Sequence, residues 1–158
     1  MEGKELPEIL IAKTLTEKGM TLAVAESCTG GLVSHRITNI PGSSDYFKGG
    51  VVAYSNDVKT FLLYVSRELL EKHGAVSAQV ARAMAKGAKS ALDADVAVAI
   101  TGIAGPAGGS EEKPVGLAHI AFASNEEIKT KKVLFEGDRE SLKEQFADAM
   151  LEVILKNV

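Results

Sequence analysis

Two neighbouring segments carry a serine, a tyrosine and a lysine, the set of groups that a nucleophilic hydrolase needs. Ser43 and Ser44 belong to Pro-Gly-Ser-Ser-Asp, and Tyr54 and Lys59 belong to Tyr-Ser-Asn-Asp-Val-Lys a few residues later. A serine hydroxyl needs a base, and a lysine whose pKa is lowered by partial burial can serve without a histidine. Tyr54 can relay the proton or orient either partner. On spacing alone, a turn serine, a packed tyrosine and a solvated lysine are the simpler explanation.

A second candidate is the segment 26–31, Glu-Ser-Cys-Thr-Gly-Gly, at the junction of an expected strand and an expected helix. Two glycines let the backbone approach a ligand, and free amides at a helix start favour an anion such as phosphate. The segment matches neither the dinucleotide nor the P-loop glycine pattern. A tight turn with Ser27 or Thr29 as helix cap explains it equally well.

A third candidate is the glycine-rich segment 100–116, which follows a buried strand. Ligands gather at the carboxyl ends of strands in open α/β sheets. The Thr101 hydroxyl and the Gly102 amide can donate to a substrate carbonyl or phosphate, as an oxyanion site requires. A surface loop without a ligand fits the composition as well.

The remaining reactive side chains are better explained by structural roles. His35, His73 and His119 are expected on a helix, near a helix end and on a strand, and none has metal-ligand spacing. Cys28 is expected to be a small packing residue. Arg139 begins the last expected helix, where an anion contact competes with simple solvation.

The elements that must position these groups follow from apolar periodicity and turn residues. Helices and strands alternate and then give way to two adjacent strands, which indicates an α/β fold with a mixed sheet. We expect helices at 7–18, 29–40, 78–92 and 139–156, a short helix that carries Lys59, and strands at 21–26, 46–55, 95–101, 115–123 and 128–135. Asn56, Ser66 and Ser77 are the expected helix caps.

Length and composition limit the classes of function. The 158 residues predict one domain, 1–158, and the 46% hydrophobic and 25% charged residues predict a folded globular chain. A net charge of -3 without a basic cluster argues against nucleic-acid binding. The single cysteine excludes an intrachain disulfide, and no apolar run reaches membrane-span length. We expect a cytoplasmic protein without a membrane segment, and an apolar face of the last helix that pairs two copies into a homodimer or higher homo-oligomer.

Several irregular motifs occurring in one order resemble the C-terminal domain of the competence/damage-inducible CinA family. They are AESCTGG at 25–31, PGSSDYF at 41–47, GGVVAYSNDVK at 49–59, GAVS at 74–77, AITGIAGPAGG at 99–109, KPVG at 113–116 and GDR at 137–139. Stand-alone members of this family are nicotinamide-nucleotide amidases. The resemblance therefore implies a three-layer α/β/α fold with a mixed, mainly parallel central sheet.

The resemblance also implies a reaction and a site. The reaction is hydrolysis of nicotinamide mononucleotide (NMN) to nicotinic acid mononucleotide and ammonia in pyridine-nucleotide recycling, without cofactor or metal. Ser44, rather than Ser43, matches the nucleophile, Lys59 the base and Tyr54 an assisting residue. The implied substrate-binding residues are Ser27, Thr29, Gly30, Gly31, Thr101, Gly102 and Arg139.

Two positions depart from the family pattern, and neither belongs to the implied set Ser44, Tyr54 and Lys59. Lys143 stands where many relatives have an arginine in the last helix, and Tyr64 replaces a frequent glycine. Fuller family members also carry a preceding molybdopterin-binding-like domain, whose activity is not expected of this chain. The alternative function is a non-catalytic module that binds a nucleotide or a partner.

Overall fold

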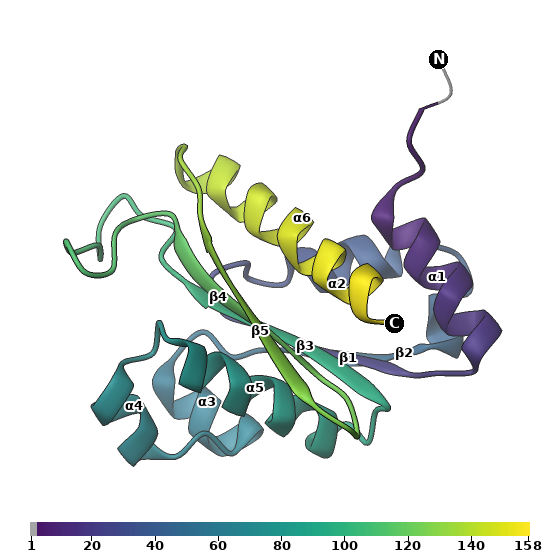
Figure 1. Cartoon of the computed structure of the whole chain (residues 1–158), viewed down its shortest axis with the longest axis horizontal. Helices are drawn as coiled ribbons and strands as arrows, with labels where there is room; N and C mark the ends of the chain where they lie inside the picture. The colour runs from purple at the N-terminus through teal and green to yellow at the C-terminus, as the bar shows by residue number, and fades with distance from the viewer. Residues whose placement is uncertain (1–2) are drawn as a thin grey trace.

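The computed structural model describes residues 3–158 and consists of a five-stranded sheet between two layers of helices (Figure 1). Helices α1, α2 and α6 cover one face of the sheet, and α3, α4 and α5 cover the other (Figure 1). The strands are β1 (Leu22–Glu26), β2 (Phe47–Val52), β3 (Val96–Gly102), β4 (Leu117–Ala123) and β5 (Ile128–Leu134). The helices are α1 (Pro7–Lys18), α2 (Leu32–Thr38), α3 (Asn56–Leu63), α4 (Arg67–His73), α5 (Ala78–Ala91) and α6 (Arg139–Asn157), with a 3-10 turn, η1, at Ser43–Asp45.

The sheet has the order β2-β1-β3-β4-β5. Strand β1 pairs in parallel with β2 and β3, β4 is antiparallel to β3, and β5 is antiparallel to β4. Only β4 therefore runs against the other four strands. This confirms the three-layer fold with a mixed, mainly parallel sheet, and the last two adjacent strands pair with each other.

Alternating side chains of the strands supply two separate cores. In β1, Leu22 and Val24 pack on the side of α2 and α6, whereas Ala23 and Ala25 pack on the side of α5. The small residues on the second side let helices approach closely. At Gly87 of α5, an added Cβ would lie 1.8 Å from the carbonyl oxygen of Leu63 in α3. The helix that carries Lys59 is thus set directly against α5.

Helix starts differ from the predicted ones at two places. The hydroxyls of Ser66 and Ser77 cap α4 and α5 as predicted, by accepting from the amides three residues on. The predicted cap Asn56 is wrong, because the Ser55 hydroxyl accepts from the Val58 amide and Asn56 is already helical. Helix α2 begins at Leu32, after two glycines with positive φ, rather than near residue 29.

The apolar face of the last helix is buried, so the predicted pairing face on this helix is wrong. Phe146, Met150 and Ile154 of α6 are almost inaccessible because they pack against the sheet. Large apolar side chains are exposed mainly between residues 52 and 64: Val52, Tyr54, Phe61, Leu62 and Tyr64. These residues lie in and around the end of β2 and α3.

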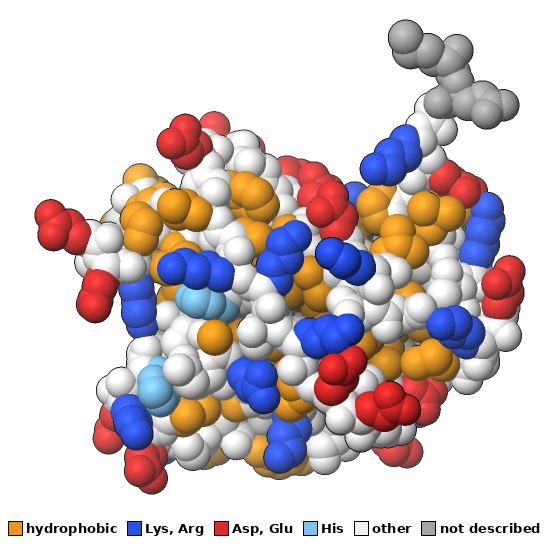
Figure 2. Space-filling model, viewed as in Figure 1, with side chains coloured by type: hydrophobic (Ala, Val, Ile, Leu, Met, Phe, Trp, Pro, Cys, Tyr) orange, Lys and Arg blue, Asp and Glu red, His pale blue; other side chains and the backbone are white. Residues whose placement is uncertain are grey.

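The edge strand β5 exposes several lysine side chains. In the space-filling view, lysine and arginine side chains cross the face on which β5 lies (Figure 2), and Lys129, Lys131 and Lys132 of β5 are exposed. Lysines on an edge strand discourage pairing with another sheet. Among residues 3–158, none of the helices is both long and apolar enough to span a bilayer.

Candidate active site

A cavity of about 280 Å³ lies at the carboxyl ends of β1 and β3. The start of α3, the loop after β3 and the start of α6 complete its walls. The loop after β3 projects from the end of the sheet near which α6 begins (Figure 1). The lining residues are Ser27, Cys28, Tyr54, Asn56, Lys59, Ala75, Val76, Thr101, Gly102, Ile103, Ala104, Gly105, Ala107, Gly108 and Arg139.

The centre of the cavity wall is a serine-lysine pair. Ser27 follows the last residue of β1, and Lys59 comes from the first turn of α3. The Lys59 Nζ lies 3.1 Å from the Ser27 Oγ. Both residues are buried, with only 2% of Lys59 exposed. The strand end and the helix start thereby hold a hydroxyl and an amine within hydrogen-bond distance.

The surroundings of Lys59 lower its pKa. Its Nζ donates to the carbonyl oxygens of Ala53 at 2.9 Å and Tyr54 at 3.4 Å, and none of the described residues that line the cavity is an aspartate or glutamate. Burial lowers the pKa of Lys59 because it disfavours the charged ammonium. In the structure the Nζ donates to the Ser27 Oγ; after loss of one proton, the amine can still donate to the two carbonyls and accept the Ser27 proton. The pair therefore has the geometry of a nucleophile and its base.

Tyr54 and Arg139 form the outer rim of the cavity. The Arg139 guanidinium donates to the Tyr54 hydroxyl at 3.0 Å and to the Gly105 carbonyl at 2.6 Å. Both side chains are exposed. Because Tyr54 accepts from Arg139, the hydrogen of its own hydroxyl remains available to a ligand. The start of α6 is thus tied to the connection between β2 and α3 and to the loop after β3.

Thr101 and Gly102 lie at the end of β3 and line the cavity, and their contact with a substrate stays a prediction. Thr101 is buried, and its hydroxyl donates to the Ala75 carbonyl at 2.8 Å. Its hydrogen is therefore engaged, and its free lone pairs remain. An added Cβ at Gly102 would lie 2.6 Å from the Ala118 side chain, so β4 itself requires a glycine at this position.

The Ser44–Lys59 pair predicted from the sequence is not formed. Ser44 is exposed in η1, before β2, and does not line the cavity. The start of β2 pairs with the start of β1, while Ser27 follows the end of β1. The five residues of β1 separate these two edges by about 16 Å. The partner of Lys59 is instead Ser27, which the family resemblance predicts to bind substrate.

The turn at residues 26–31 also differs from the prediction that its free amides bind an anion. The Glu26 carboxylate accepts from the amides of Val33 and Ser34 at the start of α2. The Thr29 hydroxyl donates to the same carboxylate, and neither Thr29, Gly30 nor Gly31 lines the cavity. The chain's own carboxylate therefore occupies two amides at the start of α2, the helix end that the sequence predicts to attract an anion.

Cys28 has the packing role predicted for it. Burial raises the pKa of its thiol to about 12, so the thiol stays protonated near neutral pH. Among residues 3–158, no three His, Cys, Asp or Glu side chains are grouped as metal ligands. Asn56 lines the cavity, although it was considered only as a helix cap. The sequence offered one indication of this role, because Asn56 lies three residues before Lys59 and such positions share one face of a helix.

Comparison with known proteins identifies the family. The model of the CinA C-terminal domain matches residues 5–158. The chain belongs to the CinA C-terminal domain family. A CinA-like protein of Geotalea uraniireducens is 51% identical over 142 residues, which are 90% of this chain and 34% of the relative. The chain thus spans about a third of the length of such curated relatives.

Solved structures of the CinA superfamily have the same fold. The competence/damage-inducible protein CihA of Agrobacterium tumefaciens is 38% identical, with a TM-score of 0.91 over 98% of both chains. A CinA superfamily protein of Escherichia coli is 31% identical, with a TM-score of 0.92 over 100% of this chain and 95% of the other. These neighbours agree with a mixed sheet between two helical layers.

Proposed function

We propose that the chain is an amidohydrolase that converts NMN to nicotinic acid mononucleotide and ammonia. The observation that carries the proposal is the hydrogen bond between Lys59 Nζ and Ser27 Oγ in a cavity without a carboxylate. A module that only binds a nucleotide has no need for a buried lysine beside a serine. Membership of the CinA family is consistent with an enzyme, and the resemblance of the sequence motifs supplies the substrate.

The proposed mechanism proceeds through an acyl-enzyme. Neutral Lys59 takes the Ser27 proton, and the Ser27 oxygen attacks the carboxamide carbon of the substrate. The C–N bond then breaks, and the nitrogen leaves as ammonia with a proton returned by Lys59. A water molecule attacks the ester, again with Lys59 as base, and releases the carboxylate and Ser27. Tyr54 can donate its free hydroxyl hydrogen to the substrate carbonyl or the leaving nitrogen.

The charge of the cavity suits the phosphate of a mononucleotide. Its wall contains Lys59 and Arg139 and no aspartate or glutamate. Because Glu26 already occupies the α2 amides, Arg139 is the proposed phosphate contact. Arg139 lies at the rim, and binding of the phosphate there provides energy remote from the reacting bond. Guanidinium groups bind phosphate oxygens through parallel hydrogen bonds.

Ammonia release from NMN by the purified chain tests the proposal, with nicotinic acid mononucleotide measured as the second product. We expect equimolar products and the same rate with and without a chelator, because the mechanism uses only side chains. Absence of hydrolysis together with saturable NMN binding contradicts the proposal and supports the binding-module alternative. Loss of activity with the chelator contradicts the metal-free mechanism.

A further inference from the structure

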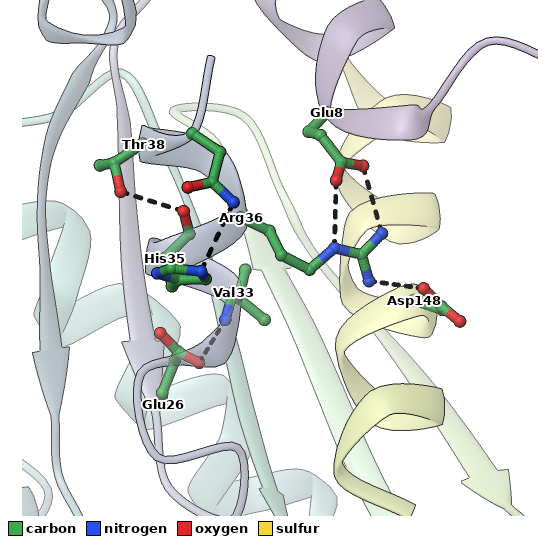
Figure 3. A network of polar contacts seen from close by, with 8 residues as sticks. Glu8, Glu26, Val33, His35, Arg36, Thr38 and Asp148 are labelled. Carbon is green, nitrogen blue, oxygen red and sulfur yellow. Dashed lines mark hydrogen bonds and ion pairs between the residues drawn. The ribbon is translucent and has the colours of Figure 1, made fainter. Parts of the chain in front are cut away.

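Glu26, the residue before Ser27, is a fully buried carboxylate with an unusually complete set of donors. Its exposed fraction is 0%. One oxygen accepts from the Thr29 hydroxyl at 2.7 Å and the Val33 amide at 2.9 Å, and the other accepts from the Ser34 amide at 3.0 Å and hydroxyl at 2.7 Å. Close-up, the carboxylate is seen below the first turn of α2 (Figure 3). No lysine or arginine is among its hydrogen-bond partners within the described residues.

Such burial is tolerated only because of these four donors. A buried carboxylate without partners is strongly unfavourable. Two of its donors are backbone amides at the positive end of a helix, which favours an anion, and hydrogen bonds to an ionised group are about twice as strong as neutral ones. The carboxylate therefore joins the end of β1 firmly to the start of α2.

Glu26 and Ser27 are adjacent residues whose side chains lie on opposite faces of the sheet. Glu26 contacts α2 on one face, whereas Ser27 meets Lys59 of α3 on the other. The two residues share one peptide unit, so a shift of Glu26 moves the Ser27 Oγ. The described hydrogen bonds of the two side chains go to different helices, so we take the backbone link as the route by which Glu26 affects Ser27.

The turn, rather than Lys59, determines where the Ser27 hydroxyl lies. Lys59 is already held by the carbonyls of Ala53 and Tyr54. Among the described residues, the Ser27 side chain has one hydrogen-bond partner, Lys59. The Ser27 carbonyl accepts from the Gly30 amide inside the same turn. The position of the hydroxyl thus depends on the turn that Glu26 closes.

We infer that Glu26 is a positioning residue, whose carboxylate holds the 26–34 turn so that the Ser27 hydroxyl faces Lys59. This inference rests on the proposed function for its kinetic test, but the geometry it concerns is independent of the substrate. Glu26→Gln is the sharpest variant, because it keeps the volume but turns an NH2 group toward donors that need an acceptor.

Glu8→Gln provides a matched control at the other end of α2. Glu8 is also buried and accepts two hydrogen bonds from Arg36, which in turn donates to Asp148 of α6 (Figure 3). Loss of the Glu8 charge therefore disturbs the same helix without touching the Ser27 turn. Ser34→Ala removes a single donor and serves as a milder variant where Glu26→Gln folds poorly.

The test compares steady-state NMN hydrolysis, thermal unfolding and Ser27 labelling by a fluorophosphonate. In labelling, the Ser27 oxygen forms a bond to phosphorus, fluoride leaves, and Lys59 takes the proton. For Glu26→Gln we expect kcat and the labelling rate to fall about 100-fold, because a small displacement of a reacting group has effects of this size. KM is expected to change less than about threefold. Glu8→Gln is expected to lower the melting temperature while kcat and labelling stay within about twofold of wild type.

Each outcome decides between positioning and general stability. Wild-type kcat and labelling in both Glu26→Gln and Ser34→Ala overturn the inference. Equal losses in Glu26→Gln and Glu8→Gln also overturn it, since both then reflect a weakened fold. If wild type labels at Ser27 but does not hydrolyse NMN, the proposed function fails. Slower labelling of Glu26→Gln in that case still supports the positioning role.

Discussion

At the scale of single residues, the protonation of Lys59 controls the proposed chemistry. Because burial lowers its pKa, we expect kcat/KM to rise with pH and level off below the usual lysine pKa of about 10.4. Lys59→Arg is expected to lower kcat/KM about 1000-fold, because a guanidinium stays protonated and cannot act as the base. A pH profile of wild type and variant from pH 6 to 10 measures both effects. A flat wild-type profile contradicts the role of Lys59 as base.

The same residue links stability to pH. Between the lowered pKa in the folded chain and the ordinary pKa in the unfolded chain, the unfolded chain binds more protons, so the free energy of unfolding rises with pH. Lys59→Met lacks this contribution. From pH 7 to 10 we therefore expect wild type to gain stability relative to Lys59→Met. The gain in the free energy of unfolding is about 1.4 kcal/mol for each unit by which folding lowers the Lys59 pKa. Urea titrations of both proteins measure the gain, and the absence of a gain with pH contradicts the buried lysine.

At the scale of elements, the contact between α5 and α3 fixes the helix that carries Lys59. A methyl group at Gly87 would meet the Leu63 carbonyl oxygen at 1.8 Å, and neither backbone can yield cheaply. We expect Gly87→Ala to lower the free energy of unfolding by about 3 kcal/mol, as overpacking does, and to lower kcat by displacing α3. Chemical denaturation and the kinetic assay test this. An unchanged free energy of unfolding contradicts this prediction, because it shows that α3 and α5 can move apart at little cost.

On the opposite face, Arg36 connects three helices through its side chain. It lies in α2 and pairs with Glu8 of α1 and Asp148 of α6, and Glu8 is only 7% exposed. Arg36→Ala leaves the buried Glu8 carboxylate without a partner, so we expect a loss of about 3 kcal/mol in the free energy of unfolding. The stability of Asp148→Asn is the control, because Asp148 is exposed and its loss leaves the Glu8 pair intact. Equal effects of the two variants contradict a buried pair.

At the scale of the whole molecule, the sequence predicted the elements better than the site. Apolar runs indicated β1, β3 and β4, which are almost fully buried. Aromatic and β-branched residues and turn signals indicated β2 and β5, which contain few buried residues, and Ser66 and Ser77 were indicated by their local capping pattern. The position of Ser44 was misjudged because it depends on the direction of the strands. Ser44 precedes β2 and Ser27 follows β1, so parallel strands place them at opposite edges of the sheet. The expectation that ligands gather at carboxyl ends already favoured Ser27.

The role of Glu26 was not predictable from the sequence. Its carboxylate is buried only because α2 begins at Leu32 and turns its first amides toward β1. A glutamate at the end of an apolar run has no local signal for burial, since most glutamates are exposed. The packing of α2 on the sheet therefore decides both the role of Glu26 and the absence of an open anion site at that helix.

The most direct test of the account compares the kcat of Ser27→Ala and Ser44→Ala for NMN hydrolysis, with both variants confirmed as folded by circular dichroism. Ser27 lies beside Lys59 in the cavity, and Ser44 lies exposed at the opposite edge of the sheet. We predict that Ser27→Ala loses at least about 1000-fold in kcat, as loss of a nucleophile does, while Ser44→Ala keeps the wild-type rate. Full activity of Ser27→Ala, or inactivity of a folded Ser44→Ala, contradicts the serine-lysine site described for this protein.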